Sequence, residues 1–577
     1  MISDASEVVY LSMEIALEPA MPTYSGGLGV LAGDTLRSAA DLEIPLVGVT
    51  LAHRKGYFQQ TLDPEGRQRE EPEDWQIGDF AELLEARAEI EIEGQPLRIA
   101  AWRYWIEGAT GFRVPVYLLD ADLPENGDSA RRLTDVLYGG DGRHRLSQEA
   151  ILGLGGLRLL RALGHRNVLR FHMNEGHAAL VVLGLLEEEA AARAGRAGAR
   201  GLELARDHCV FTTHTPVPAG HDRFPPELVA AVLGEARYKL LHECLGDGEI
   251  NMTELALRGS RFVNGVAMRH GEISRGMFPS YPIHSITNGV HVQTWAAQPF
   301  QVLFDRFLPD WRRDALSLRY AISIPHEEIW SAHQTAKRVL LEALSRLAGA
   351  HFDPDVLTLG FARRATAYKR ATLLFHDLER LRALVQGAGR LQIAFAGKAH
   401  PRDEEGKGII EQVHRARDAL AGEIAIAWLP DYDLALGKLL CAGCDVWLNT
   451  PIPPLEASGT SGMKAAVNGV PSLSILDGWW VEGHIEGHTG WAFGAREPSE
   501  QGVRSDDADA DSLYEVLGQS VIPCFYGRRA EFVEMMRQSI AINGSFFNTE
   551  RMLWQYLHGA YRIPRGVPSR EANSAEG

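Results

Sequence analysis

The sequence has few cysteines and lacks the segments that mark secreted or membrane-spanning proteins. Five cysteines among 577 residues are too few for a disulfide framework in a chain of this length. No apolar run is long enough to span a bilayer, and the N-terminus lacks the basic and apolar regions of a signal peptide. These absences predict a cytoplasmic protein that does not associate with membranes.

Cys441 and Cys444 form a lone CxxC pair within LLCAGCDVWL. A zinc site of this type needs a second pair of ligands, and neither a second CxxC pair nor a nearby histidine accompanies these cysteines. We therefore expect small buried thiols at a junction between a helix and a strand, and no metal site.

Acidic residues outnumber basic ones. The chain has 58 Lys and Arg against 76 Asp and Glu, which gives a formal net charge of -18. An acidic protein has no general electrostatic reason to bind nucleic acid or an anionic membrane. Any phosphate-bearing ligand must therefore be held by a local cluster of basic side chains.

The length predicts two domains, because one hydrophobic core rarely extends beyond about 300 residues. Short apolar runs that do not alternate with polar residues are followed by helical patterns, in two series, which favours two mainly parallel sheets. The predicted strands are 8–11, 45–50, 116–119, 168–171 and 210–212 in the first series, and 356–360, 391–396, 424–428, 446–448 and 473–476 in the second. Residues 61–105 are predicted to form a β-rich insertion, and residues 325–347 a long helix.

This pattern predicts an α/β protein with two doubly wound, Rossmann-like domains that face each other across a cleft. We expect an N-terminal domain at residues 1–300, a C-terminal domain at 301–545, and a terminal helix with a disordered tail at 546–577. Ligands of such sheets bind beyond the carboxyl ends of the strands, so the cleft is the expected site.

One lysine, Lys464, lies among small and apolar neighbours in the segment EASGTSGMKAAV. Burial lowers the pKa of a lysine, which suits an amine that forms a Schiff base. The Ser and Gly residues at 458–462 can offer backbone N–H groups to an anion at the start of a helix. A lysine beside a phosphate cradle is the pairing expected for pyridoxal phosphate. The alternative is a Gly/Ser turn before an ordinary helix with one exposed lysine.

A basic and aromatic run follows the predicted strand that ends near Phe361. It contains Arg363, Arg364, Tyr368 and Lys369. One interpretation is a clamp for a dianion, with arginine forks and a lysine charge. The other is a solvated basic loop.

Polar or Gly-rich segments follow three other predicted strands. The Gly-Gly-Leu-Gly turn at residues 26–29 opens a helix and suits an anion, but it lacks the full spacing of a dinucleotide site. Residues 174–177 and His214 follow two further strands. Polar residues at these positions are site candidates, although a histidine there often serves as a cap or packs.

Together these segments resemble the α-glucan phosphorylases, the family of glycogen, starch and maltodextrin phosphorylases. EASGTSGMK resembles the family's pyridoxal-phosphate segment, RRATAYKR its phosphate-binding segment and FTTHTP its sugar-binding segment. Matches to its TNG, YDLALGK and LDG segments occur in the family's order. The resemblance implies a GT-B-type glycosyltransferase that releases α-D-glucose 1-phosphate from α-1,4-glucan by reversible phosphorolysis. It also implies pyridoxal 5′-phosphate as the proton-shuttling cofactor, with inorganic phosphate as a substrate.

The resemblance further implies roles for individual residues. The implied catalytic residues are Lys464, Arg364, Lys369 and His214. The implied cofactor-binding residues are Lys464, Arg363, Thr460, Ser461, Gly462, Tyr432 and Trp295. The implied substrate-binding residues are Gly27, Leu28, Asn288, Glu456, Ser458, Gly459, Tyr368 and His177.

The sequence departs from the family's pattern at several positions. Ser461 and Gly462 stand where the better-known members have Gly and Asn, and Ala16 stands where they have an aromatic residue. Trp479 and Trp480 after the LDG segment are also departures. We expect contacts to the cofactor or the sugar to differ around these positions.

Three other functions stay open. The first is a nucleotide-sugar-dependent glucan glycosyltransferase of the same fold, which would need a nucleotide pocket and no imine at Lys464. The second is a glucan-binding protein with an inactive site, and the third is a pyridoxal enzyme that acts on amino acids. The chain begins almost at the first predicted strand, so we expect no allosteric control. A homodimer stays open.

Overall fold

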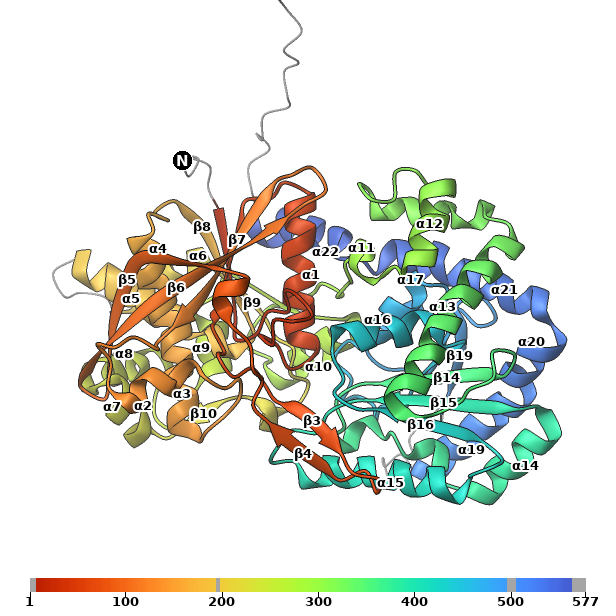
Figure 1. Ribbon diagram of the computed structural model, residues 1–577. Coiled ribbons are helices and arrows are strands. Elements are labelled where there is room, and N and C mark those ends of the chain that lie inside the picture. Colours follow the sequence, from red (N-terminus) through yellow and green to blue (C-terminus); the bar gives the residue numbers. More distant parts are fainter. Residues whose placement is uncertain (1–6, 193–197, 495–504, 563–577) are drawn as a thin grey trace, which may run out of the picture.

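A computed structural model of the protein describes residues 7–192, 198–494 and 505–562. The chain forms two large sheets with parallel cores that stand side by side, each covered by helices (Figure 1). The prediction of an α/β fold with two doubly wound units is confirmed. The predicted C-terminal tail lies, from residue 563 onward, outside the residues that the structure describes.

The first sheet has nine strands, and its core is parallel. Their order is β13 (Ile283–Ser285), β12 (Phe262–Gly265), β9 (Cys209–Thr212), β8 (Val168–Asn174), β1 (Glu7–Ser12), β2 (Leu46–Leu51), β7 (Arg113–Asp120), β6 (Gln95–Glu107) and β5 (Glu82–Ile92). The pairs β5–β6 and β6–β7 are antiparallel. The second part of the predicted β-rich insertion, which forms β5 and most of β6, therefore extends one edge of this sheet.

The second sheet has six strands, all parallel. Their order is β16 (Ala425–Leu429), β15 (Leu391–Ala396), β14 (Leu357–Ala362), β17 (Val446–Asn449), β18 (Ser472–Ile475) and β19 (Gly490–Phe493). Two small antiparallel pairs complete the strands: β3 (Gln59–Leu62) with β4 (Gln68–Glu71), and β10 (Arg223–Phe224) with β11 (Ile250–Asn251).

Helices connect the strands of both sheets. Those before residue 290 are α1 (Gly27–Asp41), α2 (Asp128–Arg131), α3 (Gly142–Ala150), α4 (Gly156–Ala162), α5 (Leu180–Ala192), α6 (Gly198–His208), α7 (Pro226–Leu233), α8 (Glu235–Leu245), α9 (Met252–Arg258) and α10 (Met268–Met277). Those after it are α11 (Val292–Trp295), α12 (Gln298–Phe307), α13 (His326–Ala348), α14 (Leu378–Ala388), α15 (Glu404–Ala419), α16 (Leu434–Gly443), α17 (Thr460–Val467), α18 (Trp480–Gly483), α19 (Asp506–Val516), α20 (Ile522–Gly527), α21 (Arg529–Gln538) and α22 (Thr549–Tyr556).

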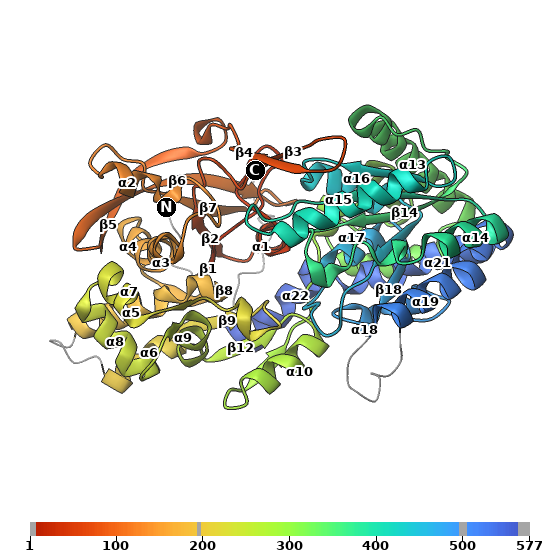
Figure 2. The ribbon, with the colours of Figure 1, turned by 90° about the horizontal axis from the view of Figure 1, so that it is seen from below.

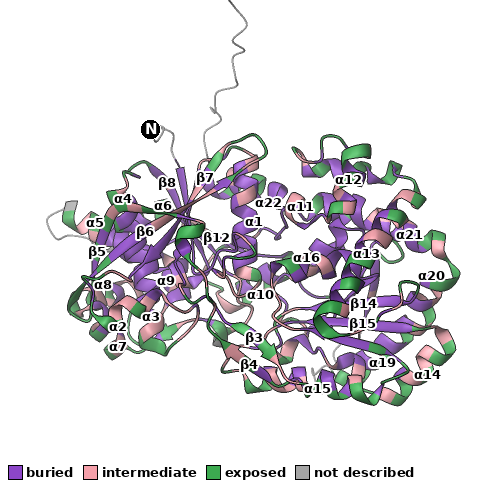
Figure 3. Ribbon diagram, in the orientation of Figure 1, coloured by how far each residue is buried: buried purple, intermediate pink, exposed green. Residues whose placement is uncertain are grey.

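Burial on both faces explains why the predicted strands are apolar without alternation. Every residue of β1, β2, β14 and β15 is buried (Figure 3). In the first sheet α1 covers one face, and α4 and α5 cover the other. In the second sheet α16 and α19 lie on opposite faces (Figure 2). Strands enclosed in this way need apolar side chains at every position.

The C-terminal end of the described chain returns to the first sheet. Helix α22 packs against α1, and Met552, Tyr556 and Tyr561 share a core cluster with Tyr10 of β1. In Figure 1 this blue helix crosses from the second sheet to the first. The domain boundaries at residues 300 and 545 stay a prediction.

The β3–β4 hairpin bridges the two halves from the other side. Its Gln60 N–H donates to Asp431 Oδ1 at 2.9 Å, and Gln68 Nε2 donates to the Ala399 carbonyl at 2.9 Å. The hairpin and α22 therefore fix the two sheets relative to each other around the space between them. Among the described residues, no helix is both long and apolar enough to cross a membrane.

Candidate functional site

A cavity of about 790 Å³ lies between the two halves, beyond the carboxyl ends of β8, β9 and β14. Its wall contains seventeen of the eighteen residues singled out from the sequence: Gly27, Leu28, His177, His214, Asn288, Trp295, Arg363, Arg364, Tyr368, Lys369, Tyr432, Glu456, Ser458, Gly459, Thr460, Ser461 and Lys464. Gly462 is the exception. The structure therefore brings the candidates together, while their individual roles stay predictions.

Lys464 is held on the buried side of the short helix α17. The helix begins after Gly459, whose φ of 86° is a left-handed conformation that favours glycine. Lys464 Nζ lies 4.0 Å from the centre of the Trp295 ring. Burial lowers the pKa of Lys464, and Asp34 opposes that shift. The amine is thus buried at the cavity wall, and the alternative of an exposed lysine on an ordinary helix is wrong.

The surroundings of Lys464 fit pyridoxal 5′-phosphate. Arg363 has two buried guanidinium nitrogens, Nε and Nη1, without a hydrogen-bond partner among the described residues, and they suit a phosphate. The first N–H groups of α17 have no partner within the helix and point toward its N-terminal end. Tyr432 and Trp295 both line the cavity, and their rings both lie within 4 Å of the Cβ position at Gly437. Amine, anion donors and aromatic walls therefore occur together.

Glu456 occupies the centre of the basic cluster. Its Oε2 accepts hydrogen bonds from Arg363 Nη2 and Lys369 Nζ, both at 2.5 Å. Burial alone would raise the pKa of Glu456, but Arg363 and Lys369 lower it to about 2. The sequence predicts a sugar contact for this residue, whereas here its carboxylate neutralises two of the cations predicted to hold phosphate.

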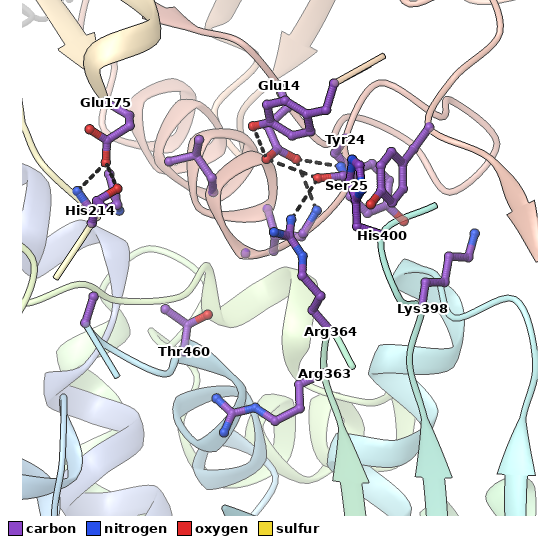
Figure 4. A pocket seen from close by; sticks show the side chains of 18 of the residues that line it. Glu14, Tyr24, Ser25, Glu175, His214, Arg363, Arg364, Lys398, His400 and Thr460 are labelled. Carbon is purple, nitrogen blue, oxygen red and sulfur yellow. Dashed lines mark hydrogen bonds between the residues drawn. The ribbon is translucent and has the colours of Figure 1, made fainter. Parts of the chain in front are cut away.

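Arg364 points away from Arg363, toward the glycine-rich turn of the first half (Figure 4). Its Nη2 donates to Ser25 Oγ at 3.2 Å. Glu14 Oε2 accepts from the Ser25 and Gly26 N–H groups at 2.5 and 3.1 Å. The arginine side chain is exposed to the cavity, so it can reach an anion there without leaving the loop.

Glu14 is a site residue that the sequence reasoning missed. Besides the turn, it accepts a hydrogen bond from the Tyr138 hydroxyl at 2.8 Å, and it is 1% exposed. The signal was available, because Glu14 follows strand β1 as His214 follows β9. It anchors the glycine-rich turn that lines the cavity.

The residues after β8 and β9 form one hydrogen-bonded group. Glu175 Oε2 accepts from the His214 N–H at 2.7 Å (Figure 4). His214 Nε2 donates to Asn174 Oδ1 at 2.7 Å. Burial lowers the pKa values of His214 and His177 to about 3. Both histidines are therefore neutral at ordinary pH and suited to hydrogen bonding.

The structure shows the surroundings of three positions that depart from the family pattern. A side chain at Gly462 would place its Cβ 2.7 Å from Trp479 Cζ2, so the glycine makes room for this tryptophan. Ser461 Oγ accepts from the indole N–H of Trp447 at 3.1 Å. Ala16 is buried beneath α1 and is not part of the cavity wall.

The expectation of small buried thiols agrees with the described part of the chain. Cys441 and Cys444 are buried where α16 meets β17, and burial raises the pKa of both thiols. No group of His, Cys, Asp and Glu side chains that could hold a metal ion occurs within residues 7–192, 198–494 and 505–562.

Comparison with known proteins gives matches over nearly the whole chain. A family model described as carbohydrate phosphorylase matches residues 234–521. A maltodextrin phosphorylase of Thermococcus litoralis is 38% identical, over 96% of this chain and 70% of that protein. A glycogen phosphorylase of Mycobacterium tuberculosis is 39% identical with the same coverage. A glycogen phosphorylase of Aquifex aeolicus is 36% identical, over 96% of this chain and 86% of its own length.

Proposed function

The chain belongs to the carbohydrate phosphorylase family and is a glycosyltransferase, and on this premise we propose that it catalyses the reversible phosphorolysis of α-1,4-glucan. The products are α-D-glucose 1-phosphate and a shortened glucan, and the cofactor is pyridoxal 5′-phosphate. One observation carries the proposal: in an acidic protein, one cavity joins the amine of Lys464 to the side chains of Arg363, Arg364 and Lys369.

Residues of the second half hold the two phosphate groups in this proposal. Lys464 is the attachment point of the cofactor, while Arg363 and the start of α17 bind its phosphate. When bound, pyridoxal phosphate supplies a phosphate with a second pKa near 6, which suits proton exchange at neutral pH. Arg364 and Lys369 bind the substrate phosphate and offset the repulsion between the two dianions.

Glu456 changes partner when phosphate binds. In the structure its carboxylate holds Arg363 and Lys369. A phosphate carries more charge than a carboxylate and presents more acceptor oxygens, so it competes for these donors. Glu456 is then free to accept hydrogen bonds from sugar hydroxyl groups.

Residues of the first half orient the sugar. The neutral His214 gives its one N–H to Asn174, so its Nδ1 can accept a hydrogen bond from a sugar hydroxyl group. The buried Asn288 can accept another at Oδ1, which has no hydrogen-bond partner among the described residues. Gly27 and Leu28, in the turn fixed by Glu14, lie on the substrate-phosphate side. We also propose domain boundaries near residues 300 and 545, with α22 docked on the first domain.

The test is a ³¹P NMR time course with maltodextrin and orthophosphate. We expect the orthophosphate signal to be replaced by that of α-D-glucose 1-phosphate, and Lys464→Ala to abolish the change. Glucose transfer from a nucleotide sugar, with none from glucose 1-phosphate, would favour the rival glycosyltransferase. Maltodextrin binding without turnover would favour the binding protein.

A further inference from the structure

Asp34 is a buried carboxylate that lies on α1, close to the cavity but outside its wall. It is 1% exposed. Its Oδ2 accepts the indole N–H of Trp295 at 2.7 Å and the backbone N–H of His291 at 3.2 Å. A buried carboxylate is costly unless donors and charges compensate it, so this one fixes the geometry of its neighbours.

Trp295 connects Asp34 to Lys464. The same indole that donates to Asp34 presents its ring to Lys464 Nζ at 4.0 Å. A cation over an aromatic face is attracted by the ring, most strongly where water is excluded. Among charged groups, Asp34 has the largest effect on the pKa of Lys464, and it opposes the lowering caused by burial.

The second carboxylate oxygen of Asp34 has no hydrogen bond. Oδ1 is buried and lacks a hydrogen-bond partner among the described residues. Arg37 Nη1 lies 3.8 Å from it, but the hydrogen bonds of this guanidinium go to the carbonyls of Ala16 and Leu17. Arg37 and Asp34 also affect Lys438 on α16: burial and Arg37 lower the pKa of Lys438, and Asp34 opposes that lowering. The Cys441 thiol of α16 is the remaining titratable group that affects Lys464.

We propose that Asp34 is a positioning residue for Lys464. It holds the Trp295 ring against the amine and supplies the fixed negative charge that stabilises the positive charge on the Lys464 nitrogen. The inference deepens the proposed function, because the same nitrogen is the proposed attachment point of the cofactor. It assigns Asp34 no contact with the sugar or its phosphate.

The test compares Asp34→Asn with Asp41→Asn in the full chain. Asparagine keeps an oxygen for Trp295 and His291 but removes the charge. Asp41 is a matched control, because it lies on the same helix and also binds His291, at 2.7 Å, without affecting the pKa of Lys464. Trace acetylation of the cofactor-free protein, read by mass spectrometry of the Lys464 peptide at several pH values, reports the pKa of this amine directly.

We expect the labelling midpoint of Lys464 to fall by roughly one pH unit in Asp34→Asn, the lower end of the effect of an adjacent opposite charge. Below both midpoints, that shift makes labelling about tenfold faster. Asp41→Asn should leave the midpoint unchanged. Equal midpoints in the unsubstituted protein and Asp34→Asn would overturn the inference.

A second variant and a second readout cover a folding defect in Asp34→Asn. Trp295→Phe keeps a ring but removes the N–H, and we expect a smaller downward shift of the Lys464 midpoint. In cofactor-loaded protein, the visible absorbance band of Asp34→Asn should titrate at lower pH than that of Asp41→Asn, and identical titrations would contradict the inference. If Lys464 does not hold the cofactor, its labelling still reports the Asp34 effect, so the two failures are distinguishable.

Discussion

Gly462→Ala tests whether the turn before Lys464 is packed as the structure describes. The new Cβ would lie 2.7 Å from Trp479 Cζ2, several tenths of an ångström inside ordinary contact. Trp479 cannot easily move aside, because its ring packs closely on the backbone of Gly483 and against Phe547. Its Cζ3 lies 2.5 Å from the position that a Cβ at Gly483 would take, and the centres of the Trp479 and Phe547 rings are 4.9 Å apart. Overpacking of this kind costs roughly 1–3 kcal/mol.

The expected result is a lower melting temperature for the transition that unfolds the second sheet. At 2–4 °C per kcal/mol for a unit of this size, the loss is roughly 2–12 °C. Gly408→Ala on α15 is the matched control, because nothing lies within 4 Å of its added Cβ. That change should be neutral or slightly stabilising, since alanine favours a helix over glycine.

A double variant separates the contact from a general effect on the helix. Trp479→Leu removes the ring that the new methyl group meets, so Gly462→Ala should cost less in that background. Differential scanning calorimetry of the single and double variants and the unsubstituted protein measures this coupling. Two results would refute the packing of Trp479 on the turn at Gly462. One is an equal melting temperature for Gly462→Ala and Gly408→Ala. The other is a loss of melting temperature from Gly462→Ala that is as large in the Trp479→Leu background as in the unsubstituted protein.

Three further predictions concern the charges of the cavity. Arg364→Ala and Lys369→Ala should each raise the KM for phosphate about ten- to hundredfold, because each removes a charge-assisted contact. Arg415→Ala, on the exposed face of α15, is the control and should leave this KM unchanged. If the Arg364 and Lys369 variants also leave it unchanged, the basic run is a solvated loop. The pKa of Glu456 is lowered from 4.5 to about 2, so its pairing stabilises the fold above about pH 4.5 and is lost as the pH falls toward 2. Glu456→Gln should therefore lower the free energy of unfolding by about 3 kcal/mol at pH 7 in urea titrations, with the difference shrinking below about pH 4.5; a constant difference would refute the pairing. Because the pKa of His214 is about 3, an acid limb near pH 6 in kcat/KM should persist in His214→Gln, and its disappearance would assign the limb to the histidine.

The sequence predicts the long, fully buried strands well, because burial on both faces leaves a continuous apolar run. It does not reveal β12, β13 and β19, because these strands are not buried at every position and contain polar residues or glycine, so they leave no continuous apolar run. It also does not show that α22 returns to the first sheet, since that packing joins residues more than 500 positions apart, such as Ser38 and Thr549.

The site residues, like the strands, are predictable where a local sequence pattern marks them and not where they depend on distant segments. Lys464 and Arg364 are found from sequence because their neighbours form recognisable local patterns. Asp34 is a single acidic residue whose partners come from a distant segment, so no local pattern marks it. Glu14 is marked by its position just after strand β1, but its pairing with Tyr138 depends on a distant segment. Glu456 is found, but its pairing with two cations depends on how the loops meet and is not visible in the sequence.

The most direct test of the central claim, that the cavity is built around a pyridoxal phosphate bound to Lys464, is borohydride reduction followed by peptide mapping. The purified, cofactor-loaded protein is reduced and digested, and the modified peptide is identified by mass spectrometry. We predict a pyridoxyl group on the peptide that contains Lys464 and no other lysine modified in comparable yield. A label on a different lysine, or no label on protein that contains the cofactor, would contradict it.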